Sequence, residues 1–277
     1  MRTLLVVILG PFLFAIISGL ATHSAPPATA ANVPAESRPG EAANPVIVEL
    51  FTSEGCSDCP TADRLLARLE ETQPVAGAEI IALEEHVDYW DSLGWKDPFS
   101  SAFFTDRQSG YVRSLHGATP YTPQMVVDGA TGFVGSDERT AMAVIAKAAR
   151  APKATVTLDQ MPNSPGDALR IRVEPSQNLN GGDDVLLAVT EDGLSSNVTR
   201  GENSGATLVH RAVARELRVV GQVAANGTFS AETNLSLVRN WKRENTRVVV
   251  FVQERSTGRV LGAASATLRV PAAGNGG

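Results

Sequence analysis

Apolar and polar positions first form a regular pattern near residue 45. Residues 46–51 (VIVELF) are apolar and rich in β-branched side chains, which predicts a buried strand. A turn leads to a stretch that begins with Pro60, an early-helix residue, and continues with a stripe of leucines: Leu65, Leu66 and Leu69. Residues 80–83 predict a second strand. The order strand, helix, strand is typical of an α/β domain.

Two further helices and a hairpin follow in the same domain. Residues 101–115 predict a helix with aromatic and aliphatic anchors. Residues 121–129 predict a strand with a turn, and a partner strand is expected at residues 133–135. Residues 136–150 are rich in alanine with apolar side chains at helical spacing, and Ser136 is the expected N-cap.

The pattern changes after residue 152 to short alternating runs separated by turn residues. These runs predict an antiparallel, sandwich-like domain. They comprise residues 154–158, 169–173, 185–190, 208–213, 217–219, 227–231, 247–253 and 260–268. The expected fold is therefore an α/β domain over residues 45–152, followed by a smaller all-β domain over residues 153–272 and a disordered tail at residues 273–277.

The first 30 residues are expected to be a secretory signal peptide. Arg2 precedes an apolar run over residues 4–20, and Ala28-Thr29-Ala30 fits a cleavage site. An uncleaved membrane anchor is the alternative, because the run is close to the shortest length that spans a bilayer. With cleavage, the mature chain begins with a flexible leader over residues 31–44, has no stable membrane anchor, and is periplasmic or secreted.

Composition narrows the function classes further. The 277 residues carry a formal net charge of −6, which argues against broad nucleic-acid binding. Two cysteines are too few for a disulfide-dense scaffold or for a four-cysteine metal site. They are sufficient for a redox pair.

The two cysteines, Cys56 and Cys59, form a C-x-x-C motif ahead of the first predicted helix. Free backbone amides and the helix dipole stabilise a thiolate at such a position. We interpret Cys56 as an exposed nucleophile and Cys59 as the resolving thiol of a thiol–disulfide couple. A static disulfide is one alternative. Half of a metal site is another, for which the mature chain offers few further ligands: His86, His116 and His210.

Two acidic residues accompany the pair. Asp58 lies between the cysteines and Glu54 lies two positions before them. Their negative charge disfavours the thiolate of Cys56 and favours the disulfide. We therefore expect a couple that is less oxidising than the strongest periplasmic oxidants.

An aromatic and acidic loop is expected over residues 86–98. Loops at the carboxyl ends of parallel strands often carry functional sites, so this loop is a possible substrate-facing surface. The residues proposed for that role are His86, Asp88, Tyr89 and Trp90. The alternative, which we favour, is a loop packed on itself through its own aromatic residues: Trp90, Trp95 and Phe99.

Several long motifs together resemble a family of uncharacterised secreted bacterial proteins in the thioredoxin-like superfamily. They are ELFTSEGCSDCP at residues 49–60, HVDYWD at 86–91, GWKDP at 94–98 and YTPQ at 121–124. The resemblance runs from Val46 to the C-terminal β-domain. It implies a thioredoxin-like fold for residues 45–152, whereas the activity of that family is itself not established.

The resemblance also gives Thr122 and Pro123 a role. In thioredoxin-like folds a cis-proline at this place faces the C-x-x-C motif and aligns the substrate backbone, although Pro120 competes for the position. The chain departs from ordinary thioredoxin in two ways: no tryptophan precedes Cys56, and Gly-Pro does not fill the motif.

These observations lead to one main hypothesis and two alternatives. The chain is expected to be an extracytoplasmic thiol–disulfide oxidoreductase that uses its CSDC pair on protein or small-molecule thiols and disulfides, with no cofactor and no metal. The first alternative is a secreted binding or assembly protein with a static disulfide. A weaker alternative is copper handling by the thiols with a histidine. The sequence leaves the oligomeric state open.

Overall fold

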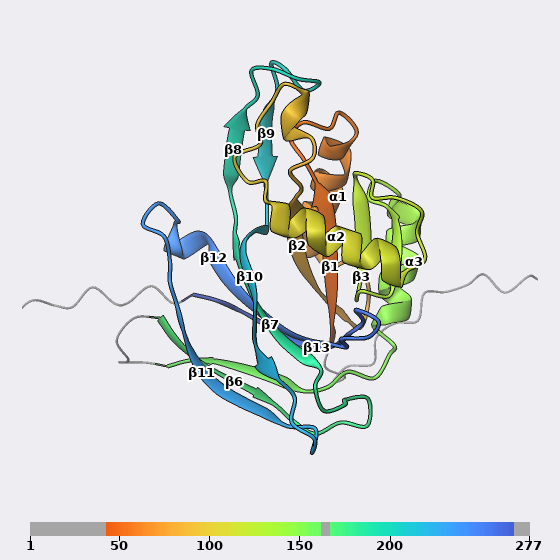
Figure 1. The fold of residues 1–277 in the computed structure, drawn as a ribbon, viewed down its shortest axis with the longest axis vertical. Helices are drawn as coiled ribbons and strands as arrows, with labels where there is room; N and C mark the ends of the chain where they lie inside the picture. The colour runs from red at the N-terminus through yellow and green to blue at the C-terminus, as the bar shows by residue number, and fades with distance from the viewer. Residues whose placement is uncertain (1–42, 162–166, 269–277) are drawn as a thin grey trace, which may run out of the picture. The chain divides into compact units, whose positions relative to one another are not determined.

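The computed structural model describes residues 43–161 and 167–268. This part of the chain contains three α-helices, α1 (Cys59–Thr72), α2 (Ala102–Ser114) and α3 (Glu138–Ala148), and two short 3-10 turns (Figure 1). Its strands are β1 (Asn44–Thr52), β2 (Ala78–His86), β3 (Gln124–Val127), β4 (Thr131–Val134), β5 (Val156–Gln160), β6 (Asp167–Val173), β7 (Asp184–Glu191), β8 (Leu194–Asn197), β9 (Thr207–His210), β10 (Val213–Gln222), β11 (Phe229–Leu235), β12 (Thr246–Gln253) and β13 (Val260–Thr267).

Eight of these strands form one mixed sheet in the order β13-β12-β7-β10-β2-β1-β3-β4. β1 and β2 run parallel over their whole length, from Asn44 opposite Ala78 to Thr52 opposite His86. β10 continues the sheet beside β2, since Val213 lies opposite Glu84 in a parallel pair. Strands from both halves of the chain therefore share one sheet.

The predicted fold class is wrong. The described chain is mostly sheet with only three α-helices, and it is not a thioredoxin-like α/β domain followed by a separate β-domain. The physical reason is the open edge of β2, which pairs with β10 instead of ending a smaller sheet. Apolar periodicity reports which faces of a strand are buried, but it does not report which strand pairs with an edge.

Helices and a second sheet cover the large sheet. Alternate residues of β1 pack on opposite faces of the sheet. Val46, Val48 and Leu50 lie in the core beneath α1 and α3, whereas Ile47 lies in the core beneath α2. A three-stranded sheet, β11-β6-β5, packs side chains such as Ile171 against β7 and β12. Both faces of the large sheet are therefore buried over much of its length.

The helix starts follow local capping chemistry. α2 begins after Ser101, whose hydroxyl accepts a hydrogen bond from the amide of Phe103. α3 begins after Asp137, whose side chain accepts from the amide of Thr140. The expectation that Ser136 caps α3 is wrong by one residue, because the longer Asp137 carboxylate reaches the free amide.

A small hairpin of β8 and β9 rises from the sheet beside the start of α1 (Figure 1, teal). The signal peptide and the tail at residues 273–277 lie outside the described residues, as does nearly all of the leader. The predicted segment boundaries stay predictions. Within the described chain, no helix combines the length and the apolar character needed to cross a bilayer.

Candidate functional site

A disulfide bond joins Cys56 and Cys59 where β1 leads into α1. Cys59 is the first residue of the helix, and Pro60 follows it in the first turn, where an amide would have no helical acceptor. The side chains are buried, with Cys56 2% and Cys59 0% exposed. The expectation of an exposed Cys56 is wrong for this disulfide form.

The loop between β8 and β9 covers the disulfide. The Asn203 side-chain amide donates to the backbone carbonyl oxygens of Glu54 and Cys56, at 2.9 Å each. The neighbouring Glu202 carboxylate accepts from the amide of Ser57 at 3.0 Å, and hydrogen bonding to Ser57 lowers the pKa of Glu202. A segment almost 150 residues away in the chain is thus bonded directly to the C-x-x-C turn.

Trp90 and Thr122 lie at the same turn. Gly55 is so close to the Trp90 side chain that an added Cβ would lie 3.0 Å from the Trp90 Cβ. The Trp90 indole donates to the Thr122 hydroxyl at 2.8 Å. The Thr122–Pro123 peptide bond is cis, which is the isomer that the resemblance implies. The loop and the proline that the sequence singles out therefore meet beside the cysteine turn.

The other residues proposed for the substrate loop face elsewhere. His86 ends β2 and is fully buried. The Asp88 carboxylate accepts from Thr105 at 2.6 Å, and the partly exposed Tyr89 donates to Gln108, which ties both to α2. These contacts tie the segment to α2, so the interpretation of a loop packed on itself through its own aromatic residues stays a prediction. Of the four residues, Trp90 lies against Gly55 of the cysteine turn.

The two acidic residues near the cysteines, Asp58 and Glu54, lie in different environments. Asp58 is exposed beside the disulfide. Glu54 is 1% exposed, and its carboxylate accepts from the Trp95 indole at 2.7 Å and lies 3.0 Å from Nε2 of His210. Its charge is therefore engaged behind the cysteine turn by specific partners.

Glu54 belongs to a buried group that we call the acid–histidine cluster: Glu54, Glu84, His86, Asp97 and His210. His210 lies between two carboxylates, with Nδ1 at 2.7 Å from Glu84 and Nε2 at 3.0 Å from Glu54. His86 places Nδ1 2.7 Å from Asp97. The cluster sits at the carboxyl ends of β1 and β2, and His210 comes from the end of β9.

Electrostatic interactions within the cluster favour the charged forms of His86, His210 and Glu84. Burial alone would lower the pKa of His210, but hydrogen bonds to Glu54 and Glu84 outweigh it and raise the pKa to about 9. Burial opposes the charged form of His86 as well, yet Asp97 and Glu84 raise its pKa well above the usual value. Burial would raise the pKa of Glu84, but the two imidazoles lower it. The charged form of each of these three side chains is therefore stabilised by its neighbours in the cluster.

Asp63 on α1 adds a further carboxyl one helical turn after Cys59. Its side chain accepts a hydrogen bond from Thr52 at 2.6 Å. Burial, and next the charge of Glu84, raise the pKa of Asp63 to about 7. This group therefore changes charge near neutral pH on the helix that begins at the disulfide.

A second buried polar group lies under α2. Arg107 donates to Glu49 at 2.5 Å and to the Tyr111 hydroxyl at 2.9 Å. Burial and the charge of Glu49 raise the pKa of Glu85 well above its usual value. Gln253 of β12 joins this group through Tyr111, so it connects α2 with the far half of the sheet. We interpret it as structural.

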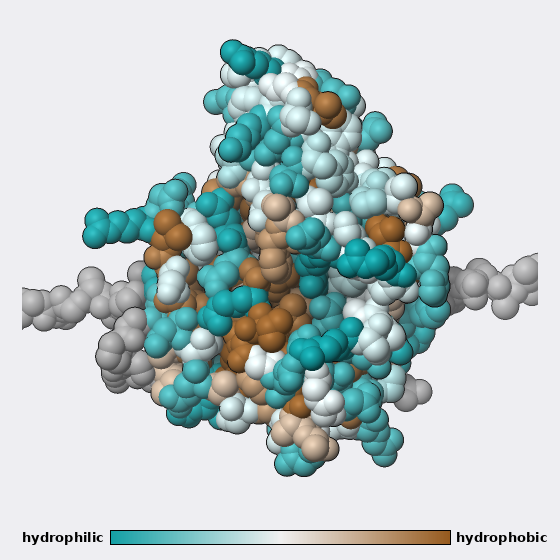
Figure 2. All heavy atoms as spheres, in the orientation of Figure 1, coloured by the Kyte–Doolittle hydropathy of each residue, from teal (hydrophilic) through white to brown (hydrophobic). Residues whose placement is uncertain are grey.

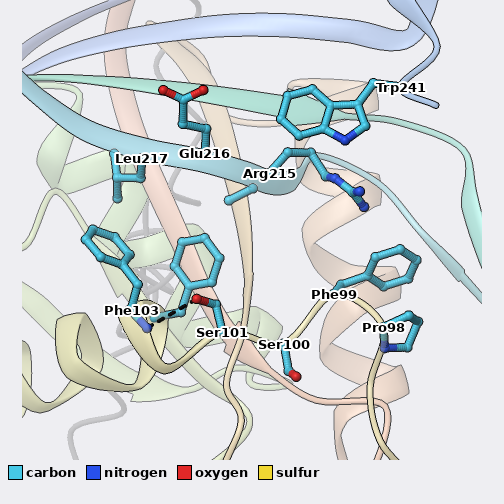
Figure 3. A pocket seen from close by; sticks show the side chains of 11 residues that line it. Pro98, Phe99, Ser100, Ser101, Phe103, Arg215, Glu216, Leu217 and Trp241 are labelled. Carbon is cyan, nitrogen blue, oxygen red and sulfur yellow. Dashed lines mark hydrogen bonds between the residues drawn. The ribbon is translucent and has the colours of Figure 1, made fainter. Parts of the chain in front are cut away.

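A pocket of about 360 Å³ opens between α2 and β10. In Figure 3, Arg215 extends between Trp241 and Phe99, and its guanidinium carbon lies 5.3 Å and 5.4 Å from the centres of their rings. Figure 2 shows apolar side chains gathered in the centre of this face, below α2. Phe99 also packs on both cluster histidines, with ring centres 5.4 Å and 5.6 Å apart.

Sequence reasoning named Glu54, His86 and His210 separately, the two histidines among possible metal ligands, but it did not bring them together. It missed Glu84 and Asp97 as their partners, and it also missed Asp63 and Asn203 beside them. A usable signal was present at the end of β2, where Glu84, Glu85 and His86 follow an apolar run. Three charged or titratable residues in a buried strand require buried partners.

The chain matches a protein family and a solved structure. A family described as "Protein of unknown function (DUF1223)" matches residues 47–253. The chain belongs to the DUF1223 family. The match spans the C-x-x-C turn, the acid–histidine cluster and the β8–β9 hairpin, so all parts of the site lie within the DUF1223 region.

Solved structures include a similar protein. Protein AGR_C_4864 from Agrobacterium tumefaciens, known from its crystal structure, is 27% identical in sequence to this chain. The two structures superpose with a TM-score of 0.64. The match covers 82% of this DUF1223 chain and 95% of the other chain. No curated protein matches the chain. The description of the Agrobacterium protein names no activity.

Proposed function

We propose that this DUF1223 protein carries out thiol–disulfide exchange outside the cytoplasm, with Cys56 and Cys59 as the redox pair. The observation that carries the proposal is the disulfide between these residues at the start of α1. Reduction would leave two thiols where free amides of the first helical turn favour a thiolate. The substrate class is a protein or small-molecule thiol or disulfide.

The exchange proceeds in two displacements. The Cys56 thiolate attacks one sulfur of a substrate disulfide, which forms a mixed disulfide and releases one substrate thiolate. The Cys59 thiolate then attacks the Cys56 sulfur, which releases the second substrate thiol and forms the Cys56–Cys59 disulfide. The substrate is reduced by two electrons and the protein is oxidised by two. The reverse sequence oxidises a dithiol substrate.

The surroundings of the pair support this assignment. Trp90 and Thr122 are hydrogen-bonded to each other beside Gly55, the residue before Cys56. Such a surface can position the backbone of a partner next to the attacked sulfur. Because Cys56 is 2% exposed, an incoming thiol reaches it only after local movement, and the loop that carries Asn203 is hydrogen-bonded to this turn.

The test is the equilibrium reduction potential of the pair, measured by thiol trapping in glutathione and dithiothreitol buffers. We expect a value within the range of exchange catalysts, about −120 to −270 mV, and towards its more reducing end. A Cys56→Ser variant should lose exchange activity on a model disulfide, whereas Ser57→Ala should retain it. Unchanged activity in Cys56→Ser would refute the assignment.

A second function is favoured by one observation, the burial of both sulfur-bearing residues. In that case the disulfide is a static structural bond in a secreted binding or assembly protein and takes no part in exchange. A potential below about −300 mV, with no exchange activity in the native state, would support this alternative. The same titration therefore distinguishes the two functions.

A further inference from the structure

We propose that Glu84, His86 and His210 form a binding site for a divalent transition-metal ion, with zinc as the best-fitting ion. This site is independent of the redox chemistry of the cysteine pair. The three side chains come from β2 and from the end of β9, and each is at least 98% buried. One ligand atom from each can be chosen so that all three lie within 4.8 Å of one another.

Both histidines are oriented as metal-binding histidines usually are. One ring nitrogen of each is held by a carboxylate: Nδ1 of His86 by Asp97 at 2.7 Å, and Nε2 of His210 by Glu54 at 3.0 Å. Such carboxylates fix the ring and leave the other nitrogen free to bind the ion. In both rings that other nitrogen faces the same oxygen, Oε1 of Glu84.

One of these nitrogens is buried and makes no hydrogen bond with the described residues, although it lies at ion-pair distance from Glu84. This atom is Nε2 of His86, and Oε1 of Glu84 lies 3.4 Å away. A buried polar atom without a hydrogen bond is costly, which an ion bound at this nitrogen would relieve. Because this nitrogen also lies at ion-pair distance from Glu84, it points to a metal ion only together with the convergence of all three ligand atoms.

Two of the three ligand separations are close to those of tetrahedral zinc, and the whole set lies within 4.8 Å. Ligands at the usual zinc–nitrogen and zinc–oxygen distances lie about 3.3 Å from one another. The separation of 3.4 Å between His86 and Glu84 already meets this value. The separation of 2.7 Å between His210 and Glu84 must widen by about half an ångström, which a rotation of the Glu84 carboxylate supplies. The fourth position would be taken by water or by a substrate atom.

Charge balance also favours a cation. The carboxylates of Glu54, Glu84 and Asp97 converge on only two imidazoles. A divalent ion would replace protons on the ligating nitrogens and offset the excess of negative charge. The donor set of two imidazoles and one carboxylate suits zinc among the first-row ions.

A pocket lies close to the site. Phe99 packs on both histidine rings and also lines the pocket between α2 and β10 (Figure 3). Phe99 is therefore a side chain that contacts both the pocket and the two histidine ligands.

The experiment is a zinc titration of the full-length mature protein after removal of metal with a chelator. Isothermal titration calorimetry should show one zinc ion per chain for the wild type. The variants His86→Gln and Glu84→Gln should weaken binding at least about tenfold. The matched control is His116→Asn, which changes an exposed histidine at positive φ to a residue that tolerates that conformation.

A measurement on the wild type alone keeps the proposal testable if those variants fail to fold. X-ray absorption of the zinc-loaded protein should show only nitrogen and oxygen ligands, at about 2.0–2.1 Å, with imidazole scattering. Sulfur at about 2.3 Å would place the ion at the cysteines and overturn the proposal. Absence of stoichiometric zinc binding, or unchanged binding in a folded His86→Gln variant, would also overturn it.

Discussion

Asn203 donates its side-chain amide to the backbone carbonyl oxygen of Cys56 at 2.9 Å, across 147 positions of sequence. The same amide group donates to Glu54, at the other end of the turn. The β8–β9 hairpin thereby covers the disulfide from one side, while β9 supplies His210 to the cluster behind it. Access to the disulfide and the order of the cluster are consequently linked through one short hairpin.

Removal of this contact should expose the disulfide. We expect Asn203→Ala to increase the rate of reduction by dithiothreitol on the order of tenfold, because loop opening no longer breaks two hydrogen bonds. The rate is measured under native conditions by trapping the released thiols. Asn234→Ala, an exposed change on β11, should reduce at the wild-type rate. Equal rates for all three proteins would show that this loop does not limit access.

Asp63→Asn should change how stability depends on pH. The folded-state pKa of Asp63 is raised to about 7 from 3.8, so the folded state holds this proton more tightly than the unfolded state. The stability that it contributes is present below about pH 4 and is lost as the pH rises to about 7. Asparagine is neutral throughout and keeps an oxygen that can accept from Thr52.

The measurement is urea unfolding of both proteins at several pH values. Relative to the wild type, Asp63→Asn should become more stable between pH 5 and pH 8, by on the order of 1–3 kcal/mol. The control is Asp58→Asn, at an exposed position of the neighbouring turn, which should not show this trend. A difference between wild type and Asp63→Asn that stays constant over this range would contradict the assigned pKa.

Arg107→Met should destabilise the fold strongly. Methionine keeps much of the side-chain volume but leaves the buried Glu49 carboxylate without the guanidinium that lies 2.5 Å away. Loss of one partner of a buried ion pair costs about 3–5 kcal/mol. Arg113→Met, at an exposed position of the same helix, should stay within about 0.5 kcal/mol. Similar unfolding midpoints for the two variants would mean that Glu49 is satisfied by other groups.

Local elements of this fold could be predicted from the sequence, and their assembly could not. Apolar periodicity located β1, β2 and the three helices, because burial of one face leaves a regular mark on the chain. The hairpin strand β8 (Leu194–Asn197) was missed, since its mostly polar residues carry no such mark. The pairing of Val213 with Glu84 depends on two strand edges meeting, which the pattern of neither strand records.

The same distinction applies to the site. The two cysteines are three positions apart, so a helix start was enough to place them together. The contact of His210 with Glu84 joins residues 126 positions apart, and only the folded sheet brings them together. The buried charges at the end of β2 required partners, but the sequence could not say which distant segment supplied them.

Gly135 is the position where a single methyl group should disturb the packing around Pro123. Its amide donates to the Pro123 carbonyl at 2.9 Å, and an added Cβ would lie 3.2 Å from the Pro123 Cβ, 3.1 Å from the Ala62 Cβ and 2.7 Å from a Leu50 methyl carbon. All three distances are shorter than ordinary contacts, and neither the proline nor the alanine can rotate away. We expect Gly135→Ala to cost about 1–3 kcal/mol in urea unfolding.

The matched change is Gly110→Ala inside α2. There the nearest atom to an added Cβ is 3.9 Å away at the end of the Arg113 side chain, so the methyl group meets no obstacle. Alanine in a helix interior should then stabilise the protein by about 0.5–1 kcal/mol relative to glycine. The two variants should move the unfolding midpoint in opposite directions. If Gly135→Ala is as stable as the wild type, the packing of Gly135 against Leu50, Ala62 and Pro123 is loose enough to accept a methyl group.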